Sequence, residues 1–520
     1  MVEMFLGNVY YKYIVILESE VLYMWQYGKK IMACVLACTM VIGSMAGGVM
    51  ISDKSAKAKD TDVEIVIDGG DVESAAGNVN GLTYKGFGLL SANSTSNLLM
   101  DYKAQDPYAY NKLLNVLFGG EHPLMNHIKM EMGNDGNNST GADSCTMRDE
   151  YEDADASRSP GFILAADAKK INPEIKVSIL RWEMPSWVQN YWNKDKKGKG
   201  YEAVYTWYKE TILDAYEKYG YMLDYINPDK NETWSPDVDF IKWFKERLST
   251  DEDFPEYVSD EAAELYRSTK IIASDENTSL NIVPEMRKDN ALYDAVDAIG
   301  FHYSTGTADS TKDYVAMAEQ DDKEVWYSEG CGSFSYSEYQ ENKTVSYGSG
   351  TLGGYQSPIA MCDCMIKSAV YSRKTHYIFQ PAIGSFYEGS QYDHKELVSA
   401  REPWSGNIHY DEAIYCLSHF YKFAKTGWEN ENNTAGIWRY IAQASDNNSN
   451  GTEHLTNEAG NPSYMTLASP DKKDFSTVVV NNSDKTLSYR IYADNMDIPS
   501  GKTLEMWETK TDSYLKHVAD

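Results

Sequence analysis

Two glutamates, Glu232 and Glu329, combine a residue type and a placement that suit chemistry on a sugar. Each lies at or just after the end of a short apolar and aromatic run, which is typical of a buried strand. A (β/α)8 barrel carries its catalytic groups at the C-terminal ends of its parallel strands. In a retaining glycoside hydrolase a carboxylic acid protonates the leaving oxygen, and a carboxylate about 5–5.5 Å away attacks the anomeric carbon. The pair therefore predicts a retaining glycoside hydrolase.

The segments that must position this pair alternate between short apolar strands and amphipathic helices. Eight such repeats indicate an α/β fold of the (β/α)8 TIM-barrel type, in which Glu232 follows strand 4 and Glu329 ends strand 7. The alternation alone is also compatible with a doubly wound open sheet. The expected strands are residues 84–89, 127–132, 176–182, 221–226, 270–274, 295–302, 324–328 and 376–380.

The pattern changes after Trp404. One expected helix, 412–423, precedes short alternating strands with turn-rich segments between them, which is typical of a β-sandwich. An isolated strand near Val63 is expected to complete this sandwich. The predicted domains are a leader at 1–58, a strand contributed to the β-sandwich within 59–80, a TIM-barrel catalytic domain at 81–404 and a β-sandwich domain at 405–520.

The N-terminal region has the features of an export signal. Lys29 and Lys30 precede the apolar stretch 31–50, and residues 55–58 offer a small-residue cleavage site. The residues before Met24 fit no part of such a signal, so translation is expected to start at Met24. A retained transmembrane anchor is the alternative, because the stretch is near spanning length. Either way the protein is predicted to be secreted or at the cell surface.

Composition narrows the class of function. The formal net charge is −30, and a nucleic-acid partner would require a basic footprint. The chain contains neither a His-Glu-x-x-His motif nor paired Cys-x-x-Cys motifs, so no metal and no cofactor is predicted. The five cysteines outside the leader are too few for a disulfide scaffold: Cys145, Cys331, Cys362, Cys364 and Cys416. Cys362 and Cys364 lie in an apolar helical run and are expected to be core residues.

Several motifs, in their order and spacing, resemble the galactocerebrosidase (galactosylceramidase) family, glycoside hydrolase family 59. This family belongs to a clan of barrels that uses strands 4 and 7. The motifs run from Gly86-Phe-Gly-Leu-Leu-Ser91 through His127-Ile-Lys-Met-Glu-Met-Gly-Asn-Asp-Gly136, Ile272-Ala-Ser-Asp275, Val296-Asp-Ala-Ile-Gly-Phe-His-Tyr303 and Trp326-Tyr-Ser-Glu329 to Glu402-Pro-Trp-Ser-Gly406.

The resemblance implies separate roles for the two glutamates: Glu232 is the acid/base and Glu329 the nucleophile. It also implies that Asn231 hydrogen-bonds the 2-hydroxyl of the sugar. Further positions at which the family contacts galactose are Thr140, Trp182 and Tyr392.

The sequence departs from the family pattern at three places. Residues 227–230 lengthen the approach to Asn231 by about one residue, so the pose of Glu232 is altered. The family's strand-8 tryptophan is replaced near Gln380, and the arginine that the sandwich lends to the site has no match. The family also continues into a lectin-like domain beyond the residues aligned here. Cleavage of β-galactosides is expected to survive these changes better than specificity for galactosylceramide.

The expected substrate is a β-galactoside or galactolipid, with membrane contact only through a lipid substrate or an uncleaved leader. Two alternatives stay open. One is a related barrel β-glycosidase on another glycan or glucolipid, and the other is a non-catalytic carbohydrate-binding surface protein.

Overall fold

The computed structural model describes residues 13–18, 61–137, 141–277, 281–303, 312–332, 358–386, 395–424, 438–447, 463–481, 485–510 and 513–519. Its centre is a closed barrel of parallel strands, in the order β10-β3-β4-β5-β6-β7-β8-β9. Strand β10 pairs with both β9 and β3, which closes the barrel and rules out the open sheet. The TIM-barrel prediction is therefore confirmed. The strands are β3 (Gly86–Ser91), β4 (His127–Glu131), β5 (Lys176–Arg181), β6 (Tyr225–Lys230), β7 (Lys270–Glu276), β8 (Ala298–His302), β9 (Glu324–Gly330) and β10 (His376–Phe379).

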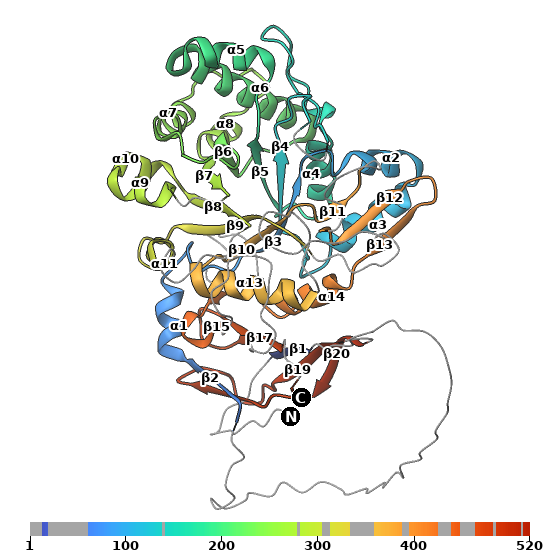
Figure 1. Cartoon of the computed structure of the whole chain (residues 1–520), viewed down its shortest axis with the longest axis vertical. Helices are drawn as coiled ribbons and strands as arrows, with labels where there is room; N and C mark the ends of the chain where they lie inside the picture. The colour runs from blue at the N-terminus through green and yellow to red at the C-terminus, as the bar shows by residue number, and fades with distance from the viewer. Residues whose placement is uncertain are drawn as a thin grey trace, which may run out of the picture.

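Helices surround the barrel and supply its outer layer (Figure 1). Their apolar faces pack on strands that are buried throughout, as parallel sheets covered on both faces require. The longest, α6, ends where Gly220 adopts a φ of 77°, a left-handed conformation that glycine accepts without strain. These helices are α2 (Asn97–Gln105), α3 (Pro107–Phe118), α4 (Pro160–Ile171), α5 (Ser186–Lys194), α6 (Tyr201–Tyr219), α7 (Val238–Ser249), α8 (Asp260–Arg267), α9 (Ile282–Lys288), α10 (Asn290–Ala295), α11 (Lys312–Glu319) and α13 (Pro358–Ser372).

Strand 4 of the barrel, β6, differs from its expected bounds of 221–226. It begins at Tyr225, because the preceding Asp224 carboxylate accepts a hydrogen bond from the Val177 backbone and turns the chain there. The register against β5 then shifts: Ile179 faces Ile226, whereas Arg181 faces Lys230. Two extra residues on β6 are thus absorbed as a bulge, so the strand does not end where its apolar run ends.

A second region of β-structure lies below the barrel in Figure 1, with α13 and α14 (Ala413–Tyr421) between the two. Its larger sheet has the order β14-β16-β17-β1-β19-β20, with β15 against β16, and β2 pairs in parallel with β18. The strands are β1 (Tyr13–Glu18), β2 (Val63–Asp68), β14 (Arg439–Tyr440), β15 (Asp446–Asn447), β16 (Ser463–Ala468), β17 (Phe475–Asn481), β18 (Tyr489–Asp494), β19 (Glu505–Lys510) and β20 (Ser513–Ala519).

Smaller elements connect these regions. A three-stranded sheet follows the barrel, and α1 joins β2 to β3. Among the described helices, none is both long and apolar enough to cross a membrane, and the apolar stretch 31–50 lies outside the described residues. These elements are α1 (Gly69–Ala76), β11 (Ile383–Gly384), β12 (Val398–Glu402), β13 (Asn407–Tyr410) and the short helices η1 (Ala156–Arg158), η2 (Lys196–Gly200) and η3 (Ala442–Ala444).

The five cysteines outside the predicted leader are all buried and free of disulfides, and the interpretation of Cys362 and Cys364 as core residues is confirmed. Cys362 and Cys364 lie in α13, whose residues are mostly buried between the barrel and the sheet of β16 and β17.

Candidate active site

Glu232 stands at the C-terminal end of strand 4, held between its two neighbouring strands. The backbone N–H of Asn231 donates to the carbonyl of Arg181, and that of Glu232 donates to the carbonyl of Asp275 (2.8 and 2.9 Å). Glu232 has a φ of 58°, a left-handed conformation that is uncommon outside glycine and typical of constrained functional residues. Its side chain remains 30% exposed, so the carboxylate is reachable from outside the barrel.

Glu329 projects from strand 7 into a more enclosed position, with its side chain only 3% exposed. The hydroxyl of Tyr303 donates a hydrogen bond to one carboxylate oxygen. The backbone N–H of Tyr303 donates to the Glu329 carbonyl at 3.1 Å, so strands 6 and 7 fix one another here. This oxygen and the backbone are therefore held in place, while the other carboxylate oxygen has no hydrogen-bond partner among the described residues and faces only the ring of His302.

His302 links the two glutamates. It ends β8 and is fully buried, and its Nδ1 lies 3.4 Å from one carboxylate oxygen of Glu232 and 3.4 Å from one of Glu329. Its Nε2 lies 3.6 Å from Oδ1 of Asp275. One imidazole therefore faces three carboxylates, a strongly stabilising environment for the imidazolium form.

A second layer of polar residues holds Asp275. Nζ of Lys129, from strand 2, lies 2.7 Å from Oδ2 of Asp275, and both side chains are fully buried. The amide of Asn227, from the bulge of β6, donates to the same oxygen at 2.8 Å. The extra residues of strand 4 thus fix the carboxylate that faces His302.

The predicted sugar-binding residues Asn231 and Trp182 lie beside Glu232. Both polar atoms of the Asn231 amide are buried and lack a hydrogen-bond partner among the described residues. Trp182 follows β5, is 8% exposed, and lies close enough to the Glu232 carboxylate to help lower its pKa. A buried amide without a partner is costly, and a polar ligand would remove that cost.

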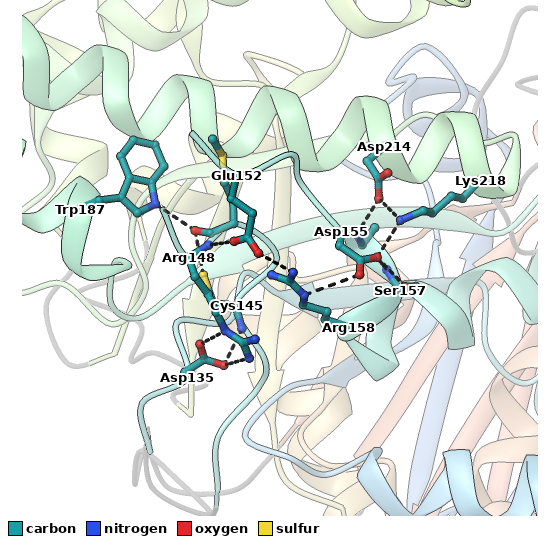
Figure 2. A network of polar contacts seen from close by, with 12 residues as sticks. Asp135, Cys145, Arg148, Glu152, Asp155, Ser157, Arg158, Trp187, Asp214 and Lys218 are labelled. Carbon is teal, nitrogen blue, oxygen red and sulfur yellow. Dashed lines mark hydrogen bonds and ion pairs between the residues drawn. The ribbon is translucent and has the colours of Figure 1, made fainter. Parts of the chain in front are cut away.

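Two other predicted residues, Thr140 and Tyr392, lie outside the described residues. The chain on either side of Thr140 is held firmly: Asn137 and Ala142 form a β-bridge, and Arg148 makes a forked contact with Asp135 at 2.6 and 2.8 Å. Figure 2 shows this contact within a network that extends to helix α6. Other members of the network are Cys145, Glu152, Asp155, Ser157, Arg158, Trp187, Asp214 and Lys218.

Sequence reasoning missed several residues of this site: His302, Tyr303, Asp275, Lys129 and Asn277, whose amide donates to Glu232 at 3.2 Å. Four of them belong to the motifs that carry the family resemblance, and all but Lys129 lie within one residue of the end of a barrel strand. Strand-end position is the signal in the sequence that points to these four.

Lys395 was also not predicted from the sequence as a residue of the site. It is buried in the segment after strand 8, and its ammonium lies 5.6 Å from the centre of the Tyr303 ring. Its positive charge lowers the pKa of both glutamates. Lys395 therefore brings a cation to the site, whereas the family's arginine has no match in this sequence.

The electrostatics of the two glutamates differ. Burial raises the pKa of Glu232, but the hydrogen bond and charge of His302 outweigh it, and the pKa lies below its usual range. Burial raises the pKa of Glu329, and the positive charge of His302 opposes this rise. The negative charge of Glu232 adds to it, and the pKa of Glu329 therefore lies above its usual range. Burial lowers the pKa of His302, but Glu329, Asp275 and Glu232 raise it to about 9. The histidine is therefore cationic at neutral pH.

Glu232, His302 and Glu329 also place donor atoms within 4.8 Å of one another, as the ligands of a divalent cation would. A protonated imidazole is not a metal ligand, because metal binding requires the neutral ring. The contacts of 3.4 Å are ion-pair distances. Without a cation, the charges of this cluster fit an imidazolium shared by two carboxylates.

The fold and the site together define a class: a (β/α)8 barrel of the glycosidase type, with carboxylates after strands 4 and 7. The sequence profile of "Glycosyl hydrolase family 59" matches residues 84–422. The chain belongs to this family.

Similar proteins agree with this membership. The chain is 28% identical to "Galactocerebrosidase" of Danio rerio over 345 residues, which are 66% of this chain and 45% of that protein. It is 29% identical to "Galactocerebrosidase" of Salmo salar, over 67% of this chain and 46% of that protein. The chain thus spans less than half the length of these curated relatives.

Solved structures share the fold. An endo-β1,6-glucanase superimposes with a TM-score of 0.54 at 14% identity, covering 84% of this chain and 90% of its own. SrfJ from Salmonella typhimurium superimposes with a TM-score of 0.52 at 13% identity, covering 82% and 91% of the two chains.

Proposed function

We propose that this chain is a retaining glycoside hydrolase that removes terminal β-galactosyl groups, as a galactosylceramidase does. The observation that carries the proposal is the separation of the two carboxylates. One oxygen of Glu232 and one of Glu329 lie within 4.8 Å of each other. Retaining enzymes need about 5–5.5 Å between the carboxyl groups, whereas inverting enzymes need about 6.5–9.5 Å to admit a water.

We assign Glu232 as acid/base and Glu329 as nucleophile on accessibility. The leaving group and the attacking water both approach the acid/base, and Glu232 is the more exposed carboxylate. The nucleophile must be fixed against the anomeric carbon, and Tyr303 fixes one oxygen of Glu329.

The pKa directions in the free protein place a proton on Glu329 more readily than on Glu232, the reverse of what these roles need during attack. The two glutamates and His302 titrate as one coupled set, so proton positions in the free protein do not fix the roles. When a glycosidic oxygen lies beside Glu232, the proton held within this set passes through Glu232 to that oxygen. Glu329 is then ionised and can attack carbon 1.

The proposed sugar contact follows from the unsatisfied amide of Asn231. A sugar 2-hydroxyl that hydrogen-bonds to it satisfies a buried group, and this bond strengthens in the transition state. Trp182 supplies an apolar face beside it. The similarity to proteins named galactocerebrosidase supports galactose as the sugar.

The test compares initial rates on 4-nitrophenyl β-galactoside, β-glucoside and α-galactoside, with Glu329→Gln as the control. We expect the β-galactoside to be hydrolysed fastest and the control to be inactive. Preference for the β-glucoside would favour the second candidate, a barrel β-glycosidase on another glycan. Equal inactivity of wild type and control on every β-glycoside would leave a carbohydrate-binding protein without catalysis.

Retention is tested separately by proton NMR of the first sugar released. We expect the β-anomer first, followed by slower mutarotation to a mixture of the α- and β-anomers. An α-product at first would contradict the double-displacement mechanism.

We further propose that the protein acts outside the cell, on the basis of the charged and apolar segments at residues 29–58. Fractionation of the producing cells, with immunodetection in medium, membrane and cytosol, tests this. Detection only in the cytosol would contradict it.

A further inference from the structure

Among the residues that the structure describes, Trp234 and Trp404 are the tryptophans with the most exposed side chains, at 77% and 74%. A single exposed aromatic side chain is common on protein surfaces and needs no ligand by itself. Trp404 lies in the turn between β12 and β13, where the N–H of Glu402 donates to the hydroxyl of Tyr102 in α2 at 2.8 Å. Trp234 differs, because it follows the proposed acid/base Glu232 by two residues.

Trp234 therefore lies near the opening of the active site. Two residues of chain span at most about 7 Å, so the Cα atoms of Glu232 and Trp234 are no farther apart than that. The side chain of Glu232 is 30% exposed, so its carboxylate faces this opening. An indole on the same turn is large enough to contact a molecule that binds or leaves there.

The turn is held by the residues at and after the end of β7. The amide of Asn281 donates to the carbonyl of Trp234 at 2.8 Å, and the amide of Asn277 donates to the carboxylate of Glu232 at 3.2 Å. The carboxylate of Glu276 accepts a hydrogen bond from the N–H of Asn281 at 2.9 Å. The same part of the chain thus positions both residues, and an aromatic side chain on a fixed backbone loses little conformational entropy on binding.

The chemistry of the proposed reaction places the leaving group on the exposed side of Glu232. The acid protonates the glycosidic oxygen, which is the atom that joins the sugar to its leaving group. Asn231 and Trp182 are the proposed contacts of the sugar, so the leaving group extends from this oxygen in the other direction, toward solvent. Trp182 is 8% exposed and Trp234 is 77% exposed. The two rings therefore mark an enclosed side and an open side of one carboxylate.

Polar side chains around this turn have partners within the protein. The ammonium of Lys230 pairs with the carboxylate of Glu183, and the hydroxyl of Thr233 donates to the carbonyl of Ser235 at 2.9 Å. A leaving group rich in hydroxyls requires hydrogen-bond partners, whereas an apolar chain requires only contact area. The exposed indole of Trp234 therefore favours an apolar leaving group.

We propose that Trp234 is a specificity-determining residue, whose indole forms the leaving-group side of the site and packs against an alkyl chain of the substrate. This inference rests on the proposed function, since it takes Glu232 as the acid/base of a β-galactosidase. It adds a residue that selects among β-galactosides by the apolar surface of the leaving group.

The test compares kcat/KM for octyl and methyl β-galactoside, below the micellar concentration of the octyl compound. The two alcohols are similar leaving groups, so the ratio of the two values reports contact with the alkyl chain. We expect the wild type to prefer the octyl compound and Trp234→Ala to lower this preference about tenfold, mainly through KM. Trp234→Phe retains an aromatic ring and should retain most of the preference. The matched control, Trp404→Ala, removes a similarly exposed tryptophan and should keep the wild-type ratio.

A variant that only folds less well lowers both rates alike and keeps their ratio, so a loss of stability does not mimic the expected result. A wild-type ratio in Trp234→Ala, or an equal loss in Trp404→Ala, would overturn the proposal.

Failure of the proposed function gives a different result, because the wild type then cleaves neither compound. Calorimetric titration with the same two galactosides decides in that case. Tighter binding of the octyl compound that is lost in Trp234→Ala supports the apolar contact, whereas equal binding of the two compounds, or none, overturns it.

Discussion

Strand β9 carries a buried glutamate near each end, and the two have opposite environments. Glu324, at the start, contacts Lys85 at 2.6 Å and Lys270 at 3.3 Å and accepts hydrogen bonds from Tyr225 and Trp326. Glu329, near the end, has one oxygen without a hydrogen-bond partner among the described residues, and the cation that faces this oxygen, His302, is shared with other carboxylates. Two identical side chains on one strand thus differ in their partners: the carboxylate of Glu324 is fully paired, and that of Glu329 is only partly paired.

The pKa values follow this difference. Burial raises the pKa of Glu324, but the charges of Lys85 and Lys270 outweigh it and hold it at about 2. At Glu329 burial prevails, and the pKa is raised. A buried charge with all its partners contributes to folding stability. A buried charge that lacks some of its partners costs stability, and a substrate that supplies those partners removes this cost. The buried charge at the N-terminal end of the barrel therefore serves stability, whereas the charge at the C-terminal end suits function, as is general for this fold.

The largest expected effect is on activity at the C-terminal end. Glu329→Gln removes the proposed nucleophile and should lower kcat by about 10⁴-fold or more. Its stability should equal or exceed that of the wild type, because a buried, partly paired carboxylate is replaced by a neutral amide. Steady-state kinetics and thermal melting measure the two effects. Loss of folding in this variant would contradict the comparison.

The same substitution at the other end should act on stability. Glu324→Gln leaves Lys85 buried without its counter-charge, and we expect a loss of about 3–5 kcal/mol in the free energy of unfolding. Urea denaturation measures it. Glu319→Gln, which removes the partner of Arg373 in a partly exposed pair, is the control and should cost no more than about 1 kcal/mol. Equal losses in both variants would show that the burial of Glu324 does not increase its contribution to the free energy of unfolding.

A smaller effect separates the proposed roles of the two glutamates. Glu232→Ala removes the proposed acid/base and should slow hydrolysis of an unactivated β-galactoside by about 10²-fold or more. A 2,4-dinitrophenyl leaving group needs no acid, and azide needs no base, so both should restore much of the rate. Glu329→Ala should yield an azide product of inverted configuration only. The reverse pattern would exchange the two roles.

The smallest expected effect is the pH dependence of stability that His302 introduces. Its pKa is about 9 in the folded protein and near 6.5 when unfolded, so its contribution is complete below pH 6.5 and disappears as pH rises through 9. We expect no more than about 3 kcal/mol to be lost across this window. Urea denaturation from pH 6 to 10 measures the slope, which should flatten in His302→Gln.

His419 serves as the control for that slope. Burial lowers its pKa to about 3, so its effect on stability lies on the acid side, with the opposite sign. His419→Gln should leave the alkaline slope unchanged. A flattened slope in this variant would point to a cause other than His302.

The sequence predicted most of the barrel strands to within a few residues, because buried parallel strands leave clear periodic patterns. It failed at β6, where the apolar run 221–226 precedes and only partly overlaps the strand Tyr225–Lys230. Asp224 and the bulge decide those bounds through contacts with β5, and no local pattern encodes them.

The candidate site shows the same division. Glu232, Glu329, Asn231 and Trp182 follow from strand counting and from the family motifs. The ion pair of Lys129 with Asp275 and the position of His302 do not, because these residues come from strands 2, 5 and 6 and meet only when the barrel closes. The roles of Thr140 and Tyr392 stay predictions.

The order of strands and helices along the chain determined by itself that two glutamates stand at one end of a barrel, because parallel strands joined by helices all end on the same side. Which of them has the higher pKa was decided only by the tertiary structure. Desolvation and the distances to His302 depend on long-range packing, and these set the opposite pKa directions of Glu232 and Glu329.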